Sequence, residues 1–201
     1  VEGLNPGTAY RYEVIAAGQT AAAAGMFTTA APLTEKHGLR FGVTGDWRGE
    51  LRPYVALSNV VEREPAFFVL LGDTIYADYP SEAVNKRQCE TLEDFRRKHE
   101  EIYTARFGRN YWPEVRAAVP LYACIDDHEV TNDFAGGAGP FTMPEFASDP
   151  ALMINRTRLY SDAMHAFFEY HPLADTVWKD TGDPRFDGRP KLYRYQTFGS
   201  D

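Results

Sequence analysis

The sequence predicts an α/β domain that follows a short β segment, because two patterns of apolar residues meet near residue 38. Before this position, alternating residues and turn clusters indicate β structure. After it, short apolar stretches alternate with stretches whose apolar residues recur at helical spacing, as in domains built on a parallel sheet. Three of the apolar stretches also run directly into acidic residues, namely Asp46, Asp73 and Asp127. Since ligands gather beyond the carboxyl ends of parallel strands, these acids are expected to meet.

Residues 1–32 are expected to be the C-terminal end of an N-terminal β domain. Apolar and polar side chains alternate along residues 10–14, and residues 26–29 are typical of one more short strand. Two strands are too few for an independent sandwich. The segment resembles the last strands of a fibronectin-III-like domain in its Leu-x-Pro-x-Thr-x-Tyr pattern, which consists of Leu4, Pro6, Thr8 and Tyr10.

Residues 38–201 are predicted to form the α/β domain. Three apolar stretches predict its strands, at residues 39–43, 67–71 and 119–125. The middle stretch is apolar at every position, as in a strand covered on both sides of a sheet. Helical spacing predicts its helices, at residues 53–63, 91–107 and 156–170. Two more elements are expected, a long loop rich in Gly, Pro and Phe at residues 132–149 and a final strand at residues 191–198.

The composition is that of an ordinary globular protein. Of the 201 residues, 44% are apolar and 25% are charged, which excludes a disordered chain, a collagen and a disulfide scaffold. The 21 basic and 29 acidic residues give a net charge of −8, so we expect no stable complex with nucleic acid. The longest apolar run, residues 66–71, is too short to span a membrane, and no secretory signal is visible. Cys89 and Cys124 fit no zinc-ribbon spacing and are expected as two thiols or one disulfide.

The acids at the strand ends predict a metal site. Carboxylates held close together repel one another, and burial further disfavours their charged form. Bound cations remove both costs. Aspartate, together with the tyrosine, histidine and glutamate of residues 72–78 and 126–133, suits Fe, Mn, Zn or Ca better than a soft metal held by thiolates.

Each of these residues taken alone has a more ordinary interpretation. A Gly-Asp pair is usually a turn, the run of acids after the third strand suits the start of a helix, and Tyr76 is typical of a packed aromatic residue. Asp78 and Asp133 are expected as solvated loop acids, and the helical His99 and His165 as structural or surface groups. The repetition of acids after three successive strands favours a site over these interpretations.

Two segments carry specific motifs. Residues 72–78 read Gly-Asp-Thr-Ile-Tyr-Ala-Asp, and residues 126–133 read Asp-Asp-His-Glu-Val-Thr-Asn-Asp. They resemble the Gly-Asp-x-Ile-Tyr and Asp-Asp-His-Glu-Val segments of the PhoD-like alkaline phosphatase/phosphodiesterase family, within the calcineurin-like metallophosphoesterase superfamily. Residues 163–172 and 192–194 are similar to a later helix and strand of that family, so the resemblance covers essentially the whole chain. It implies a metallophosphoesterase-type double β-sheet sandwich flanked by helices.

The resemblance also implies the chemistry, which is hydrolysis of phosphate monoesters or diesters by a metal-activated hydroxide at a dinuclear site. The two ions would be Fe³⁺ with Ca²⁺, with Mn²⁺ or Zn²⁺ as alternatives. Asp73 would bridge the ions, which lie roughly 3.5–4 Å apart in such sites. The implied metal ligands are Asp46, Asp73, Tyr76 and Asp127.

Three further residues receive roles from the resemblance. His128 would stabilise the transferring phosphoryl group or protonate the leaving oxygen, and Glu129 would orient His128. Arg48 stands where the wider superfamily has a histidine, and it would clamp phosphate with two hydrogen bonds.

The chain also departs from the family pattern. No cysteine lies near Asp46, where some members have an iron ligand, and the family's later ligands would follow Asp201. This polypeptide is therefore expected to have weak or no activity alone, whereas its parent protein is expected to be active and exported. Two other functions stay open. One is a mononuclear or metal-free hydrolase with Asp127 and His128 as acid and base, and the other is a non-catalytic secreted binding protein stabilised by Ca²⁺.

Overall fold

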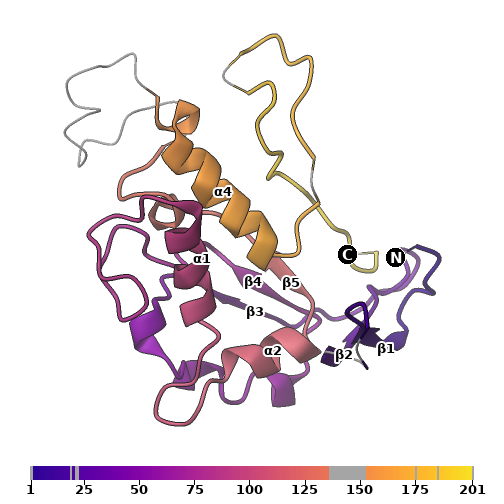
Figure 1. Ribbon diagram of the computed structural model, residues 1–201. Coiled ribbons are helices and arrows are strands. Elements are labelled where there is room, and N and C mark those ends of the chain that lie inside the picture. The colour runs from indigo at the N-terminus through magenta and orange to yellow at the C-terminus, as the bar shows by residue number, and fades with distance from the viewer. Residues whose placement is uncertain are drawn as a thin grey trace.

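The computed structural model describes residues 2–18, 20, 23–135, 153–174, 176–184 and 186–200. They form a mixed α/β fold in which a two-stranded hairpin lies beside a three-stranded parallel sheet (Figure 1). The α/β class predicted from the sequence is therefore confirmed. Within the described residues, no helix combines the length and the apolar character needed to cross a membrane.

The parallel sheet has the strand order β3-β4-β5. Its strands are β3 (Phe41–Thr44), β4 (Phe67–Leu70) and β5 (Leu121–Ala123). Because all three run in the same direction, their carboxyl ends lie at one edge of the sheet. The three strands expected from the apolar stretches are thus present, in an order that brings the segments after them together.

One face of this sheet is buried and the other is largely open. Phe68 and Leu70 of β4 point into the core and are only 3% and 1% exposed, whereas Phe41 and Val43 of β3 are each 52% exposed. Coverage on both sides was predicted only for the middle strand, β4, whose second face carries the half-buried Phe67 and Val69, so this prediction is met only in part among the described residues. The second sheet of the expected sandwich is not among these residues.

Two long helices pack against each other over the buried face. Helix α1 (Leu92–Glu101) begins at Thr91, whose side chain accepts a hydrogen bond from the backbone N–H of Asp94 in a capping box. Helix α4 (Arg158–Tyr170) ends just before His171-Pro172, as predicted. Fully buried Phe95 and Phe167 lie in the shared core. An ion pair of 2.5 Å between Arg96 and Glu169 joins the helices at the surface.

Three predictions about secondary structure are wrong. The helix expected at 53–63 is two separate 3₁₀ turns, Val55–Leu57 and Val61–Arg63, which lie between the left-handed residues Tyr54 and Glu64. The helix expected to reach residue 107 stops at Glu101. Residues 191–198 form no strand, and the alternate residues Tyr193 and Tyr195 are 80% and 94% exposed, without a neighbouring described strand to cover them.

Helix α2 (Trp112–Ala118) was not expected, although Pro113 near its start is a recognised signal for a helix N-terminus. Trp112 and Val115 anchor it in the core. Of the loop expected at 132–149, residues 136–149 lie outside the described part of the chain.

The N-terminal hairpin consists of β1 (Ala9–Val14) and β2 (Ala23–Thr28), paired antiparallel. Both strands were predicted, although the second begins earlier than expected. Tyr10 stacks on Phe27 across the pair, with ring centroids 5.8 Å apart. The hydroxyl of Tyr12 lies 3.5 Å from the carbonyl oxygen of Ala117, so the hairpin touches α2. Its origin in a separate β domain stays a prediction.

Candidate metal centre

The acidic residues after the three strands meet at the carboxyl edge of the sheet. The backbone N–H of Asp46 donates to the carbonyl of Gly72 at 3.3 Å, and that of Trp47 donates to the carbonyl of Asp73 at 2.6 Å. These bonds tie the segment after β3 to the segment after β4. Both Asp46 and Asp73 have left-handed backbone angles, with φ of 57° and 52°, a conformation that costs non-glycine residues energy and often marks functional sites.

Gly72 allows the segment after β4 to approach the segment after β5 closely. Its φ is +107°, and a Cβ atom added there would lie 2.5 Å from both the Cβ and the backbone nitrogen of Asp126. Only glycine fits this contact. The Gly-Asp pair after β4 is therefore more than a turn, because it sets Asp73 directly against the acidic segment that follows β5.

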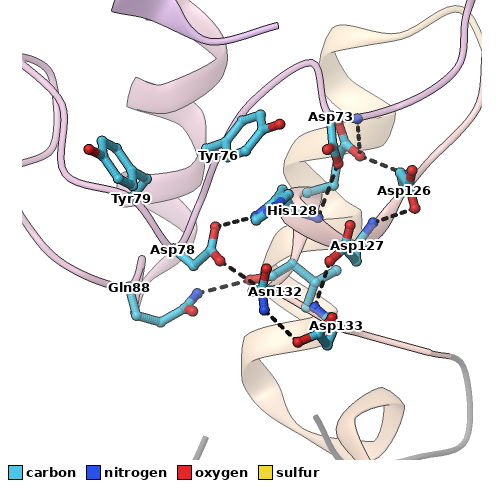
Figure 2. A network of polar contacts seen from close by, with 12 residues as sticks. Asp73, Tyr76, Asp78, Tyr79, Gln88, Asp126, Asp127, His128, Asn132 and Asp133 are labelled. Atoms are coloured by element: carbon cyan, nitrogen blue, oxygen red, sulfur yellow. Dashed lines mark hydrogen bonds and ion pairs between the residues drawn. The ribbon is translucent and has the colours of Figure 1, made fainter. Parts of the chain in front are cut away.

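Three side chains form the candidate metal centre, which we define as Asp73, Asp127 and His128. One possible ligand atom from each lies within 4.8 Å of the others. The backbone N–H of His128 also donates to Oδ1 of Asp73 at 3.3 Å (Figure 2). Asp73 is only 6% exposed, and its burial raises the pKa of the carboxyl despite the opposing charge of His128. The site therefore holds negative charge in a place where only a cation or a proton can offset it.

The donor atoms fit a hard or intermediate cation. Two carboxylates and one imidazole are ligands that Zn²⁺, Mn²⁺ and iron accept, and the carboxylates also suit Ca²⁺. Neither cysteine takes part. Cys89 is buried, Cys124 is exposed, and both are free thiols, so the alternative of a disulfide is wrong.

Glu129 fastens the two segments that supply the centre. Its carboxylate accepts hydrogen bonds from the backbone N–H groups of Asp73 at 2.9 Å, Thr74 at 2.6 Å and Asp126 at 2.8 Å. The hydroxyl of Thr74 adds a fourth at 2.8 Å. Complete burial raises the pKa of Glu129 to about 7, even though these donors favour the charged form. The hydrogen bonds of Glu129 go to the segments after β4 and β5 and not to the His128 ring. Glu129 therefore holds together the two segments that contain Asp73 and His128.

Asp78, rather than Glu129, orients the His128 ring. Its Oδ1 lies 2.7 Å from Nδ1 of His128, and its Oδ2 accepts a hydrogen bond of 2.9 Å from the backbone of Asn132 (Figure 2). The expectation of a solvated loop acid is wrong, since the Asp78 side chain is only 14% exposed. Burial alone would lower the pKa of His128, but the bond to Asp78 and the charges of the nearby aspartates outweigh it and raise the pKa.

Tyr76, Asp46 and Arg48 lie beside the centre. The Tyr76 ring stacks on His128 with centroids 4.0 Å apart, and its hydroxyl donates to Oδ1 of Asp46 at 3.4 Å. Burial, followed by the charge of Asp73, raises the pKa of Tyr76. The guanidinium of Arg48 lies 5.3 Å from the centre of the Tyr76 ring and 4.9 Å from that of Tyr79. All six residues selected from the sequence therefore gather at this edge of the sheet.

Other polar residues singled out in the sequence support the centre or lie elsewhere. Asp133 donates its backbone N–H to Oδ2 of Asp127 at 2.6 Å. Its own exposed carboxylate accepts a hydrogen bond from the Asn132 side chain at 2.6 Å. His99 is fully buried between α1 and α4. His165 lies at the surface, 3.2 Å from Glu169.

Comparisons with known proteins agree with this geometry. A family model described as PhoD-like phosphatase matches residues 45–201. The chain is 26% identical over 209 aligned residues to alkaline phosphatase D of Bacillus subtilis (strain 168), covering 99% of this chain and 33% of that protein. A solved structure titled "Structure of PhoD" has a similar fold, with a TM-score of 0.68 and 21% identity over 98% of this chain and 36% of that one. The chain thus spans about a third of the length of these two proteins.

Proposed function

The chain belongs to the PhoD-like phosphatase family, and from this membership we propose that it supplies the first part of a catalytic centre that hydrolyses phosphate esters. One observation carries the proposal, which is that Asp73, Asp127 and His128 place possible ligand atoms within 4.8 Å of one another inside the matched segment. The relative from Bacillus subtilis is named alkaline phosphatase D. The substrates are phosphate monoesters, diesters or both, and by family analogy the whole protein is exported.

The metal ligands in this proposal are Asp46, Asp73, Tyr76 and Asp127, whereas His128, although its ring lies within reach of the same ion, serves as the proton donor. Asp73 is buried, and both the Tyr76 side chain and the backbone N–H of His128 interact with its carboxylate. Its two oxygens would allow it to hold both ions, which we propose to be Fe³⁺ with Ca²⁺, or Mn²⁺ or Zn²⁺. Bound ions would offset the charge of the phosphoryl oxygens and activate water for attack on phosphorus.

His128 handles the proton of the reaction. Asp78 engages its Nδ1, which leaves Nε2 to act on the substrate, and the raised pKa keeps the ring protonated to higher pH. As the oxygen of water forms a bond to phosphorus, the bond from phosphorus to the leaving oxygen breaks, and Nε2 of His128 gives its proton to that oxygen. One proton of the water stays on the phosphate product, the other leaves to solvent, and His128 regains a proton from solvent. Arg48, held over Tyr76, is placed to bind phosphoryl oxygens.

The test compares two aspartate-to-asparagine variants of the full-length protein. D73N removes charge at the centre, so we expect loss of bound metal and of most activity toward p-nitrophenyl phosphate and its diester. D180N is the matched control, since Asp180 is exposed and its left-handed backbone suits asparagine equally well. Normal metal content and activity in D73N would overturn the proposal.

A chelator separates the remaining functions. Activity that survives complete metal removal and still needs Asp127 and His128 would favour acid–base hydrolysis without metal. Folding that depends on Ca²⁺, without turnover of either aryl ester, would favour a binding protein. The proposed function requires turnover that the chelator abolishes and that added metal restores.

A further inference from the structure

A pocket of about 340 Å³ begins at the two residues that precede the acidic segment after β5, in a part of the chain that the proposed mechanism does not use. It is formed by the end of β5, the start of α4 and the segment from Trp178 to Tyr193. Its volume falls in the range of small-molecule sites. Most of the residues that line it are apolar or aromatic, so the occupant has a largely apolar body.

The pocket and the metal centre are continuous along the backbone. Cys124 and Ile125 line the pocket, and the next residues are Asp126 and the ligand Asp127. Two residues span at most roughly 7 Å of extended chain. A molecule with its phosphoryl group at Asp127 is therefore close enough to extend its other end into the pocket.

The walls favour a flat ring. Tyr160, Trp178 and Tyr193 contribute aromatic surfaces, with the rings of Trp178 and Tyr193 in edge contact at 6.4 Å. Aromatic surfaces prefer stacked or edge-on contact with another ring. Arg189 also lines the pocket. Burial raises the pKa of the Tyr160 hydroxyl, and the charge of Arg189 partly opposes this increase.

We propose that this pocket binds the organic group of the phosphate ester, a planar aromatic or heteroaromatic ring. The proposal rests on the proposed function for the position of the phosphoryl group. Ring binding itself depends on the pocket alone, so it can be tested without turnover.

Cys124 provides the readout. It is an exposed free thiol at the pocket wall, whereas Cys89 is fully buried, so iodoacetamide should label Cys124 selectively. We expect phenol to slow alkylation of Cys124 several-fold at saturation, and cyclohexanol to have little effect at the same concentration. Phenylphosphonate, which cannot be hydrolysed, should protect at lower concentration than phenol, whereas methylphosphonate should not protect.

Variants assign the protection to the pocket. W178A should raise the half-protecting concentration of phenol about tenfold, the expected loss for one aromatic contact, whereas W178F should restore most of the protection. F107A is the control, because Phe107 is 84% exposed and lies outside the pocket. Equal alkylation rates with and without phenol in the unmodified chain would overturn the proposal. So would protection that W178A and W178F leave unchanged.

D73N separates this proposal from the proposed function. Protection by phenol that persists in D73N, together with normal metal content and activity, would retain the pocket and reject the metal centre. If phenylphosphonate no longer protects D73N at a lower concentration than phenol does, the result would support both the pocket and the metal centre. A phosphatase that binds metal but gives no protection by phenol would reject the pocket alone.

Discussion

The carboxylate of Asp78 lies 2.7 Å from Nδ1 of His128 and at the same time accepts the backbone N–H of Asn132 at 2.9 Å. One side chain thus connects the segment after β4 with the segment after β5 and fixes the plane of the histidine ring. Tyr76 stacks on the same ring at 4.0 Å, so the ring is restrained both in its plane and on its face. If His128 is the proton donor, as we propose, a ring held in this way needs little reorganisation during the reaction.

The first prediction is that D78N lowers the turnover number of the full-length enzyme about 10- to 100-fold, the usual cost of losing an orienting partner. Asparagine keeps an oxygen for the Asn132 backbone, but it no longer stabilises a protonated His128. Metal content should stay near normal, because Asp78 is not a proposed ligand. Steady-state kinetics with p-nitrophenyl phosphate and metal analysis check this. An unchanged turnover number would show that Asp78 only ties the loops together.

The second prediction concerns the close approach at Gly72. A methyl group there would lie 2.5 Å from Asp126 in a backbone conformation that alanine rarely adopts, so G72A should lower the free energy of unfolding by about 3 kcal/mol or more. Urea unfolding measures the change. G108A is the matched control, since Gly108 also has a positive φ but no atom within 4 Å of an added Cβ. It should cost about 1 kcal/mol from backbone strain alone. Equal effects of the two substitutions would contradict the predicted clash.

The convergence of the acids could be predicted from the sequence because it needs only local information. Apolar stretches ending in Asp46, Asp73 and Asp127 predict strands with acids at one end, and parallel strands bring those ends together. The three strands of the structure have this arrangement. The capped start of α1 was predictable for the same reason, since Thr91 and Asp94 lie three residues apart.

The functions of Asp78 and Glu129 could not be predicted in this way. Their partners in the other segment lie 50 to 56 residues away in the sequence and meet them only in the folded chain. The two 3₁₀ turns in place of a helix at 53–63 were missed because the apolar spacing there is helical, and spacing alone does not distinguish one continuous helix from separate turns. The exposed face of β3 was not foreseen because an apolar strand does not reveal which side is covered.

The third prediction is that E129Q destabilises the fold although it keeps the size of the side chain. The Glu129 carboxylate accepts four hydrogen bonds in a fully buried position. The amide nitrogen of glutamine can only donate, so it would lose the hydrogen bonds that one carboxylate oxygen accepts. We expect a loss of about 1–3 kcal/mol in the free energy of unfolding. E114Q, on the exposed face of α2, should stay within about 0.5 kcal/mol of the unmodified chain. Urea unfolding at neutral pH compares the two, and an E129Q stability equal to that of E114Q would contradict the role assigned to Glu129.

The fourth prediction is an acid sensitivity that arises between α1 and α4. His99 and His171 are buried with ring centroids 5.4 Å apart. Neither nitrogen of His99 nor Nε2 of His171 has a hydrogen-bond partner among the described residues. Burial lowers the pKa of His171 to about 4, against a bond from its ring to the carbonyl of Phe167, and burial also lowers the pKa of His99. The charge of Arg116 on α2 disfavours protonation of both rings.

The direction of the change in stability with pH follows from the protons that the folded and unfolded chains bind. An unfolded histidine has a pKa near 6.5, so between about pH 6.5 and 4 the unfolded chain binds protons that the folded chain does not, and stability falls as the pH is lowered. His171 alone should cost about 2 kcal/mol at pH 5 relative to pH 7.5. H99F keeps a ring against Tyr170, removes two unpaired nitrogens and should flatten the pH dependence without loss of stability at pH 7.5. H37Q, at an exposed position, should leave the pH dependence unchanged. Urea unfolding at both pH values tests this, and an H99F chain as acid-sensitive as H37Q would contradict the assignment.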